Sequence, residues 1–465
     1  MKNMLILFLL LSNSCLFAQK NYQLFQPNLT RNVIIYTPRN FNPNENLPLV
    51  INMHGFLTTN SFQMDYTKFN NTADTARCIV AYPQGKDLRW NSGTFFGVPS
   101  VADDVGFLAD VMDLSAVLFN TNLRKVYAAG YSAGGFMCYK LACDLTNRVA
   151  AIAPNVASML LDNLSTCVPA RPMPICAFNG SADPITAYNG IPFNFPGIDS
   201  VKHFWQIKNN CDQIPVTDTL PDLQNDGTRV VRYTYTNCTN ATQQVFYKVL
   251  NGGHTWPGAD DVFLGLIGKT TRDIDMNNTA WNFFKTKEIP LQLVCDAPQN
   301  LQAVFISSDS VQVSWEAIAG VNTYRVALVD DSDRVHFFET SGNEMGLTLN
   351  PAKRYKWNIA SICSSGFHNW NTTRNLNQLP TSLKNVSNKI LHVYPNPAAD
   401  VLHIDLRQNQ IKSAQVIIYD EVGNIVYQEE KSLVNTLDIS FLAAGNYFLE
   451  IKSDADLFLR KFIKL

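Results

Sequence analysis

One serine of the sequence stands in a setting that suits nucleophilic catalysis. Gly130-Tyr131-Ser132-Ala133-Gly134 has the pattern G-x-S-x-G, directly after a strand-like apolar run and before a helical pattern. In such a strand-turn-helix setting the serine backbone is strained and its hydroxyl is exposed above the sheet, and glycines keep neighbouring side chains from colliding. We therefore predict that Ser132 is a nucleophile and that the Ala133 N–H is a donor to an oxyanion.

A serine hydroxyl needs a base, and His254 is the histidine whose position suits that task. It follows the predicted strand 245–250 in a loop where Gly252 and Gly253 let the ring reach over the sheet edge. His54 precedes the serine, and His203 lies in the predicted helix 199–209. The other four lie in or beyond a later β-rich part of the chain: His336, His368, His392 and His403.

The third member of a triad is expected between the serine and the histidine in chain order, if the fold is an α/β-hydrolase. Asp183 lies just past the predicted strand 174–178, at the carboxyl end of a strand, where the site of an open α/β sheet lies. Asp199, Asp218 and Asp226 lie in the same interval but do not follow a strand so directly. A turn-forming or helix-capping role is the alternative for Asp183.

The second oxyanion donor is expected in the loop that follows the predicted strand 48–53, which reads His54-Gly55-Phe56-Leu57. We predict the Phe56 N–H as this donor, because Gly55 allows the backbone to turn it inward. His54 would shape the loop without transferring a proton.

Substrate contacts are predicted less directly. Trp90, Trp256 and Phe56 could line an apolar or aromatic acyl pocket, or they could pack in the core. Asp104 could contact substrate or cap a helix.

The elements that must position these residues alternate between strand and helix patterns from residue 33 to about residue 288. The strand candidates are residues 48–53, 78–82, 126–130, 149–153 and 174–178, and several are too apolar to be half exposed. Helical patterns cover residues 104–119 and 134–144. The alternation predicts an α/β fold with a parallel sheet covered on both faces.

Six ordered motifs in residues 19–290 resemble the secreted esterase family of polyhydroxybutyrate depolymerases, feruloyl esterases and related carbohydrate esterases. They are His54-Gly55, Ala81-Tyr82-Pro83-Gln84-Gly85, Asp103-Asp104-Val105-Gly106-Phe107, residues 130–135, Asn179-Gly180-Ser181-Ala182-Asp183 and Gly252-Gly253-His254-Thr255-Trp256-Pro257-Gly258. The resemblance implies an α/β-hydrolase, a triad of Ser132, Asp183 and His254, and no cofactor. It also supports a disulfide between Cys211 and Cys238.

Two smaller all-β domains are predicted beyond residue 290. Residues 295–367 alternate with period two and resemble a fibronectin type III module, with Trp315, Tyr324, Tyr355 and Trp357 as its core. Residues 368–390 are polar and predict a linker. Residues 391–465 resemble the C-terminal sorting domain of the type IX secretion system, which implies that the secretion machinery is a partner; an ordinary accessory sandwich is the alternative.

The amino-terminal 18 residues read as a signal peptide, because the apolar run from Met4 to Leu11 is far shorter than the roughly 20 residues that a membrane span requires. We expect no later membrane span. Export permits disulfides, and the more plausible pairs are Cys143 with Cys167, Cys211 with Cys238 and Cys295 with Cys363. Cys78, Cys138 and Cys176 read as buried hydrophobes, and the spacings match no zinc pattern.

The balance of charged residues argues against nucleic acid and anionic lipid as partners. The chain has 37 Lys plus Arg against 39 Asp plus Glu, a formal net charge of -2, so it has no global field that would attract nucleic acid or anionic lipid. A length of 465 residues suggests roughly three domains.

The leading hypothesis is a secreted serine carboxylesterase acting on esters of an extracellular polymer. Feruloyl or acetyl esters on plant polysaccharide come first and polyhydroxyalkanoate second. A serine peptidase of the prolyl-peptidase type and a non-catalytic polymer-binding adhesin are the rival hypotheses.

Overall fold

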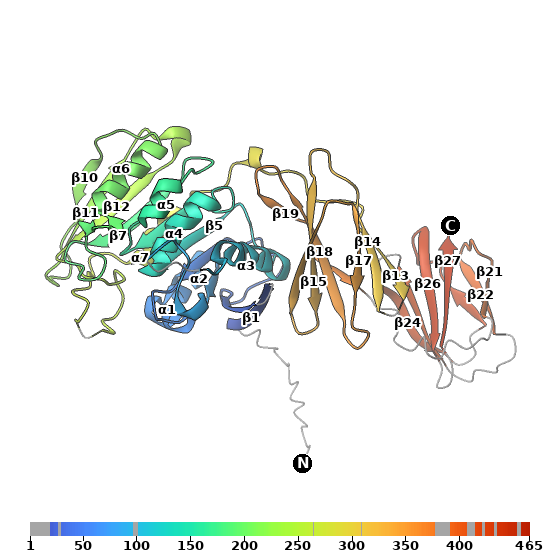
Figure 1. Ribbon diagram of the computed structural model, residues 1–465. Coiled ribbons are helices and arrows are strands. Elements are labelled where there is room, and N and C mark those ends of the chain that lie inside the picture. The colour runs from blue at the N-terminus through green and yellow to red at the C-terminus, as the bar shows by residue number, and fades with distance from the viewer. Residues whose placement is uncertain are drawn as a thin grey trace, which may run out of the picture. The chain divides into compact units, whose positions relative to one another are not determined.

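The computed structural model describes ten stretches of the chain (Figure 1): residues 19–26, 29–95, 101–263, 265–307, 309–376, 391–406, 414–420, 424–431, 435–452 and 457–465. The predicted signal peptide, residues 1–18, lies outside them. The chain divides into two compact units, Met1–Met112 with Phe119–Ile289 and Asp113–Leu118 with Pro290–Leu465. Of the helices in the described stretches, none has the length and apolar character needed to cross a membrane.

The first unit contains a sheet with strand order β10-β11-β12-β7-β6-β5-β3-β4-β2-β1. From β4 to β12 all neighbours pair in parallel, and antiparallel strands extend the sheet at both ends. The strands are β1 Gln19–Gln26, β2 Leu29–Tyr36, β3 Leu49–Met53, β4 Ile79–Pro83, β5 Val126–Tyr131, β6 Ala151–Asn155, β7 Ile175–Gly180, β10 Val216–Thr219, β11 Arg229–Tyr235 and β12 Gln244–Leu250. The predicted α/β fold class is confirmed.

The central strands are buried on both faces because their sequences are continuously apolar. Every residue of β3, β4, β5, β6 and β7 is buried, which requires cover on both sides of the sheet. The helices that supply this cover are α1 Asn60–Thr67, α2 Phe69–Ala76, α3 Asp104–Phe119, α4 Ala133–Asp144, α5 Leu161–Thr166, α6 Ile198–Lys208 and α7 Met276–Phe284. A two-stranded sheet, β8 Gly190–Ile191 with β9 Phe195–Pro196, lies between α5 and α6 in the chain.

The second unit begins with two antiparallel sheets that share one core. One has the order β13-β14-β17 and the other the order β16-β15-β18-β19, with β20 also paired to β18. Trp315, Tyr324 and Trp357 are buried in the core, and Tyr355 packs against it. The bounds are β13 Gln302–Ser307, β14 Ser310–Ser314, β15 Thr323–Asp330, β16 Val335–Thr340, β17 Glu344–Thr348, β18 Tyr355–Ile362, β19 His368–Trp370 and β20 Arg374–Leu376. The likeness to a fibronectin type III module remains a prediction.

The structure differs from the predicted linker over its first nine residues. β19 and β20 both pair with β18, so residues 368–376 are part of the middle sheet. Backbone pairing and the burial of His368 and Leu376 hold them there despite their polar sequence. Residues 377–390 lie outside the described residues.

The rest of the second unit is built from two further antiparallel sheets, β21-β22-β25 and β24-β23-β26-β27. Leu402, Val416, Leu449 and Phe462 are fully buried members of its core. The bounds are β21 Leu391–Tyr394, β22 Val401–Leu406, β23 Ala414–Asp420, β24 Ile425–Lys431, β25 Thr436–Asp438, β26 Gly445–Lys452 and β27 Leu457–Lys464.

The three disulfides are the pairs that the sequence favoured: Cys143–Cys167, Cys211–Cys238 and Cys295–Cys363. Cys78, Cys138 and Cys176 are buried and unpaired. The first two disulfides span 24 and 27 residues, whereas Cys295–Cys363 spans 68 residues of the second unit.

The long loop closed by Cys295–Cys363 makes this disulfide the largest restraint on the unfolded chain. We expect the double variant Cys295→Ser/Cys363→Ser to lose about 4 kcal/mol of stability in the second unit, because the entropy of loop closure grows with loop length. Scanning calorimetry of the full chain should show the transition of the second unit moving to lower temperature. Cys143→Ser/Cys167→Ser is the control, and it should move the transition of the first unit instead. An unchanged second-unit transition in the first variant would contradict the expectation.

Candidate active site

Ser132 lies in a strained turn between β5 and α4. Its φ is 54° and its ψ is -117°, a conformation that costs a non-glycine residue about 1–3 kcal/mol. Two backbone hydrogen bonds of 3.0 Å hold it, from Ser132 N–H to the Asn155 carbonyl and from Phe136 N–H to the Ser132 carbonyl. The Ser132 side chain does not cap α4, so the helix does not compete for the hydroxyl.

The glycines of the turn are required by close backbone contacts. A Cβ on Gly130 would lie 2.3 Å from the carbonyl carbon of Gly134, and a Cβ on Gly134 would lie 2.2 Å from the Met53 carbonyl oxygen. The amino-terminal end of α4 therefore packs directly on the carboxyl end of β3 with no side chain between them.

Asp183 and His254 form a buried hydrogen bond at the same end of the sheet. His254 Nδ1 lies 2.7 Å from Asp183 Oδ2, and both residues are buried. The other carboxylate oxygen, Oδ1, accepts the N–H groups of Ile185 and Thr186, each at 2.8 Å. A carboxylate bonded in this way holds the proton of the imidazole on Nδ1 and leaves Nε2 as an acceptor.

Two residues that sequence reasoning missed join the serine turn to the histidine loop. Tyr131 donates its hydroxyl to the His254 carbonyl at 2.7 Å, and its ring centroid lies 5.1 Å from that of His254. Asn155, whose carbonyl holds Ser132, donates its side-chain amide to the Thr255 carbonyl at 3.0 Å. Tyr131 occupies the variable position of the G-x-S-x-G pattern, and Asn155 ends a buried strand. Their closeness to the ends of strands that carry the site is the one feature of the sequence that could have identified them.

The structure brings Ser132 and His254 to one sheet edge without a hydrogen bond between their side chains among the described residues. Catalytic hydrogen bonds of this kind are often long or absent without substrate and tighten when it binds.

The predicted oxyanion donors both belong to backbone close to Ser132. A Cβ on Gly55 would lie 2.9 Å from the Tyr131 ring and 3.5 Å from Ser132 Cβ, so the Gly55–Phe56 peptide is beside the nucleophile. Neither the Phe56 N–H nor the Ala133 N–H has a hydrogen-bond acceptor within the described part of the chain. Two free donors next to a nucleophile can stabilise a developing oxyanion.

His54 holds the orientation of the Gly55–Phe56 peptide. It is fully buried, and its Nδ1 lies 2.7 Å from the Gly55 carbonyl oxygen. Its Nε2 accepts the Gly85 N–H and lies close to the Gln84 amide, both at 2.9 Å. Because a trans peptide is planar, a carbonyl turned toward His54 directs the Phe56 N–H the opposite way. Burial lowers the pKa of His54 from 6.5 to about 4, so the ring is neutral near pH 7.

Trp90 and Asp104 are buried and support this loop, which agrees with the packing alternative for Trp90 and does not favour the substrate contact predicted for either residue. The Trp90 indole is buried and donates to the His54 carbonyl at 2.8 Å. Asp104 is buried in an ion pair with Arg31 at 2.6 Å, and its second oxygen accepts the Asn91 N–H at 2.6 Å. Asp104 does not cap α3 either. The side chain that accepts an N–H group at the start of this helix is that of Asp103, which bonds to the Gly106 N–H at 2.8 Å.

Trp256 is also buried, so of the three aromatic residues predicted as contacts only Phe56 is exposed. The Trp256 indole donates to Asn277 at 3.0 Å and is 1% exposed, whereas Phe56 is 44% exposed. Phe95, which the sequence did not single out, is 37% exposed, and its ring centroid lies 6.5 Å from that of Phe56. Phe95 also meets Phe136 on α4 at 6.1 Å.

The strand order, with Ser132 after β5, Asp183 after β7 and His254 after β12, is that of the α/β-hydrolase fold. In sequence, the chain is similar to several proteins named as esterases. It is 27% identical over 262 residues to "Putative esterase NocK" of Nocardia uniformis subsp. tsuyamanensis, covering 51% of this chain and 74% of the relative. It is 28% identical over 239 residues to feruloyl esterase B of Piromyces equi, covering 48% of this chain and 42% of that enzyme.

A third relative is the bifunctional acetylxylan esterase/xylanase of Neocallimastix patriciarum, 24% identical over 233 residues, with 50% of this chain and 32% of that enzyme covered. The chain thus spans less than half of the two fungal enzymes. Among solved structures, acetyl xylan esterase from Aspergillus awamori matches with a TM-score of 0.41 and 16% identity, over 57% of this chain and 99% of that one.

The carboxyl-terminal domain has a direct family match. The family described as "Secretion system C-terminal sorting domain" matches residues 392–465. Of the three resemblances drawn from the sequence, those to esterases and to a sorting domain are confirmed.

The burial of a neutral His54 makes stability depend on pH. Its pKa is about 4 in the folded chain and 6.5 when exposed, so the unfolded chain binds the additional proton. This contribution to stability is complete above pH 6.5 and is lost as the pH falls toward 4, by about 3 kcal/mol in total. Glutamine does not titrate, so we expect the midpoint of urea denaturation to depend less on pH between 6.5 and 4 in His54→Gln than in the wild type. His203→Gln, on the exposed face of α6, is the control and should keep the slope; equal slopes for wild type and His54→Gln would contradict the expectation.

Proposed function

We propose that the protein is an exported serine carboxylic ester hydrolase that acts on esters carried by an extracellular polymer. The observation that carries this proposal is the buried Asp183–His254 hydrogen bond beside the strained turn in which Ser132 is partly exposed. Ester hydrolysis as the reaction is supported by the three relatives that are named as esterases.

In the proposed reaction the Ser132 oxygen attacks the ester carbonyl while His254 Nε2 takes the hydroxyl proton. The N–H groups of Phe56 and Ala133 bind the oxyanion, and Asp183 stabilises the imidazolium that forms. His254 then gives the proton to the departing alcohol, which leaves an acyl group on Ser132. The same histidine next activates a water that releases the acid and restores the serine.

The acyl group that the site suits best is an aromatic one. Phe56 and Phe95 present ring surface next to the nucleophile, and Phe136 extends this row toward the core. Aromatic rings pack favourably on such a surface. This supports feruloyl esters of plant polysaccharide as the first substrate class, with acetyl esters on the same polymers next and polyhydroxyalkanoate after them.

The sorting domain at residues 392–465 supports export by the type IX secretion machinery, which we propose as the partner of this part of the chain. An extracellular or cell-surface location agrees with three disulfides, because these bonds persist in oxidising surroundings.

Variants of the three proposed catalytic residues test the mechanism. We expect Ser132→Ala to lower kcat on a nitrophenyl ester by at least about 10³-fold and Asp183→Asn by about 10⁴-fold, because the asparagine favours the wrong imidazole tautomer. Asp199→Asn is the matched control, since Asp199 is a neighbouring exposed carboxylate paired with Lys202, and it should retain full kcat. Full turnover by folded Ser132→Ala would refute the mechanism, and cleavage of peptides without cleavage of esters would favour a peptidase.

The aromatic surface can be tested separately. We expect Phe95→Ala to lower kcat/KM for methyl ferulate about tenfold while changing kcat/KM for nitrophenyl acetate less than twofold, because only the larger acyl group reaches the ring. Phe338→Ala removes an equally exposed ring from β16 and should change neither value. Faster hydrolysis of polyhydroxybutyrate than of methyl ferulate or acetylated xylan by the wild type would overturn the order of substrates.

A further inference from the structure

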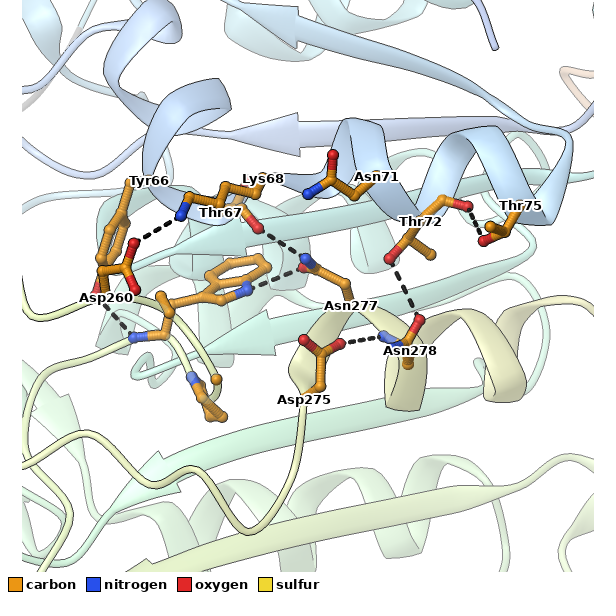
Figure 2. Close-up of a pocket in the computed structure, with 14 residues that line it drawn as sticks. Tyr66, Thr67, Lys68, Asn71, Thr72, Thr75, Asp260, Asp275, Asn277 and Asn278 are labelled. Carbon is orange, nitrogen blue, oxygen red and sulfur yellow. Dashed lines mark hydrogen bonds and ion pairs between the residues drawn. The ribbon is translucent and has the colours of Figure 1, made fainter. Parts of the chain in front are cut away.

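A cavity of about 320 Å³ opens beside the histidine loop, and its lining contains none of the proposed catalytic residues (Figure 2). Its walls come from the end of α1, from α2, from the segment that follows His254 and from the beginning of α7. Its volume is at the lower end of the range for ligand sites, about 300–1,000 Å³, and suits a small ligand.

The lining of this cavity is polar, unlike the surface around Phe56. Amide and hydroxyl side chains line it from α2 and α7, and Thr72 on α2 is hydrogen-bonded to Asn278 on α7 (Figure 2). The two aromatic residues of the lining, Tyr66 and Trp256, are 4% and 1% exposed, so their rings offer almost no apolar wall. A feruloyl ring would lose water here without gaining apolar contact, which excludes this cavity as the acyl site.

Several polar groups of the cavity are left for a ligand. The side-chain amide of Asn71 and the side-chain nitrogen of Asn278 have no partner within the described stretches of the chain, whereas the Asn278 side-chain oxygen accepts from the Thr72 hydroxyl at 3.3 Å. Asp275 uses one carboxylate oxygen to accept the Asn278 N–H at 2.7 Å, and the other has no described partner. Donors and acceptors of this kind match the hydroxyl groups of a sugar.

The walls are held in place before any ligand binds. Asn277 lies between them, donating to the Thr67 carbonyl at 2.7 Å and accepting from the Trp256 indole at 3.0 Å. Trp256 N–H also donates to the Tyr66 hydroxyl at 2.9 Å. A preformed site avoids the entropy cost of ordering its side chains on binding.

The charges of the cavity favour a neutral ligand. Lys68 and Asp260 form an exposed ion pair at 2.6 Å and offset each other. Asp275 remains as the one other charged residue of the lining, and its carboxylate would repel phosphate, sulfate or a uronic acid.

We propose that this cavity binds one neutral sugar ring of the polymer that carries the ester, an inference that rests on the proposed function. Its position supports this role, because Trp256 and Pro257 in its wall follow His254 by two and three residues. His254 must deliver its proton to the departing alcohol, so the sugar side of the ester lies on the side of the histidine loop. The cavity would therefore bind the alcohol half of the substrate while the aromatic surface receives the acyl half.

Binding of xylotetraose, an unesterified neutral sugar chain, to the full-length Ser132→Ala variant tests the site without using catalysis. Isothermal titration should detect binding that weakens about tenfold in Asn71→Ala/Asn278→Ala, because two neutral hydrogen bonds are lost. Asn71→Trp, which fills the cavity, should abolish binding, and Asn282→Ala, on α7 but outside the lining, should leave it unchanged. An absence of xylotetraose binding, or equal affinity in all variants, would overturn the proposal; circular dichroism confirms that each variant is folded.

Kinetics on two esters then separate this inference from the proposed function. In the catalytically intact chain, Asn71→Ala/Asn278→Ala should lower kcat/KM about tenfold for a feruloylated arabinoxylan oligosaccharide and leave methyl ferulate unchanged. An equal loss on both esters would contradict the sugar site. If the wild type cleaves neither ester but binds xylotetraose through these residues, the esterase proposal fails and the sugar site stands. If it cleaves methyl ferulate without binding xylotetraose, the reverse holds.

Discussion

The direct backbone contact between the start of α4 and the end of β3 is the constraint on which the site depends. Gly134 can approach the Met53 carbonyl only because it has no side chain. This contact turns the chain so sharply after β5 that Ser132 adopts a positive φ, at a cost of about 1–3 kcal/mol that the packed sheet must support. It also sets the β3 loop, with Gly55 and Phe56, beside the serine. One close approach thereby places both the proposed nucleophile and the proposed oxyanion donors.

The loop that follows β3 is supported by buried polar residues that bond to one another. His54 is neutral and bonded at both nitrogens, Trp90 donates to its carbonyl, and Asp104 with Arg31 holds the next part of the loop. Each of these groups would be costly to bury without its partner. A loop held by several satisfied bonds has few alternative arrangements, so the Phe56 N–H is oriented before substrate arrives and need not reorganise during the reaction.

The architecture was predictable because the central strands are continuous apolar runs whose burial leaves little choice of fold. The serine turn and the histidine loop were also predictable, since glycines surround both and each follows such a strand. For Trp90, Trp256 and Asp104 the sequence left a substrate contact and a structural role both open, for a physical reason: residue type says that an indole or a carboxylate needs a partner, but not whether the partner is substrate or protein. In all three cases the partner belongs to another element of the protein, which is adjacent in space but separated by at least 21 residues in sequence. β19 and β20 were missed because backbone pairing, which the sequence does not display, holds these polar strands.

An ester has two halves of different chemistry, and the geometry of the proposed reaction assigns each to a different side. If the carbonyl binds to the Phe56 and Ala133 N–H groups as proposed, the exposed rings of Phe56 and Phe95 are the aromatic surface available to its acyl group. The alcohol oxygen must reach His254, so the rest of the polymer extends along the segment from His254 to Asp260, where the lining is polar. Reversing the substrate would bring the apolar ring to the amides and the sugar to the phenylalanines, and both halves would lose hydration without compensation. The distribution of polar and aromatic surface around one hydrogen-bonded histidine thus favours a single orientation of the ester.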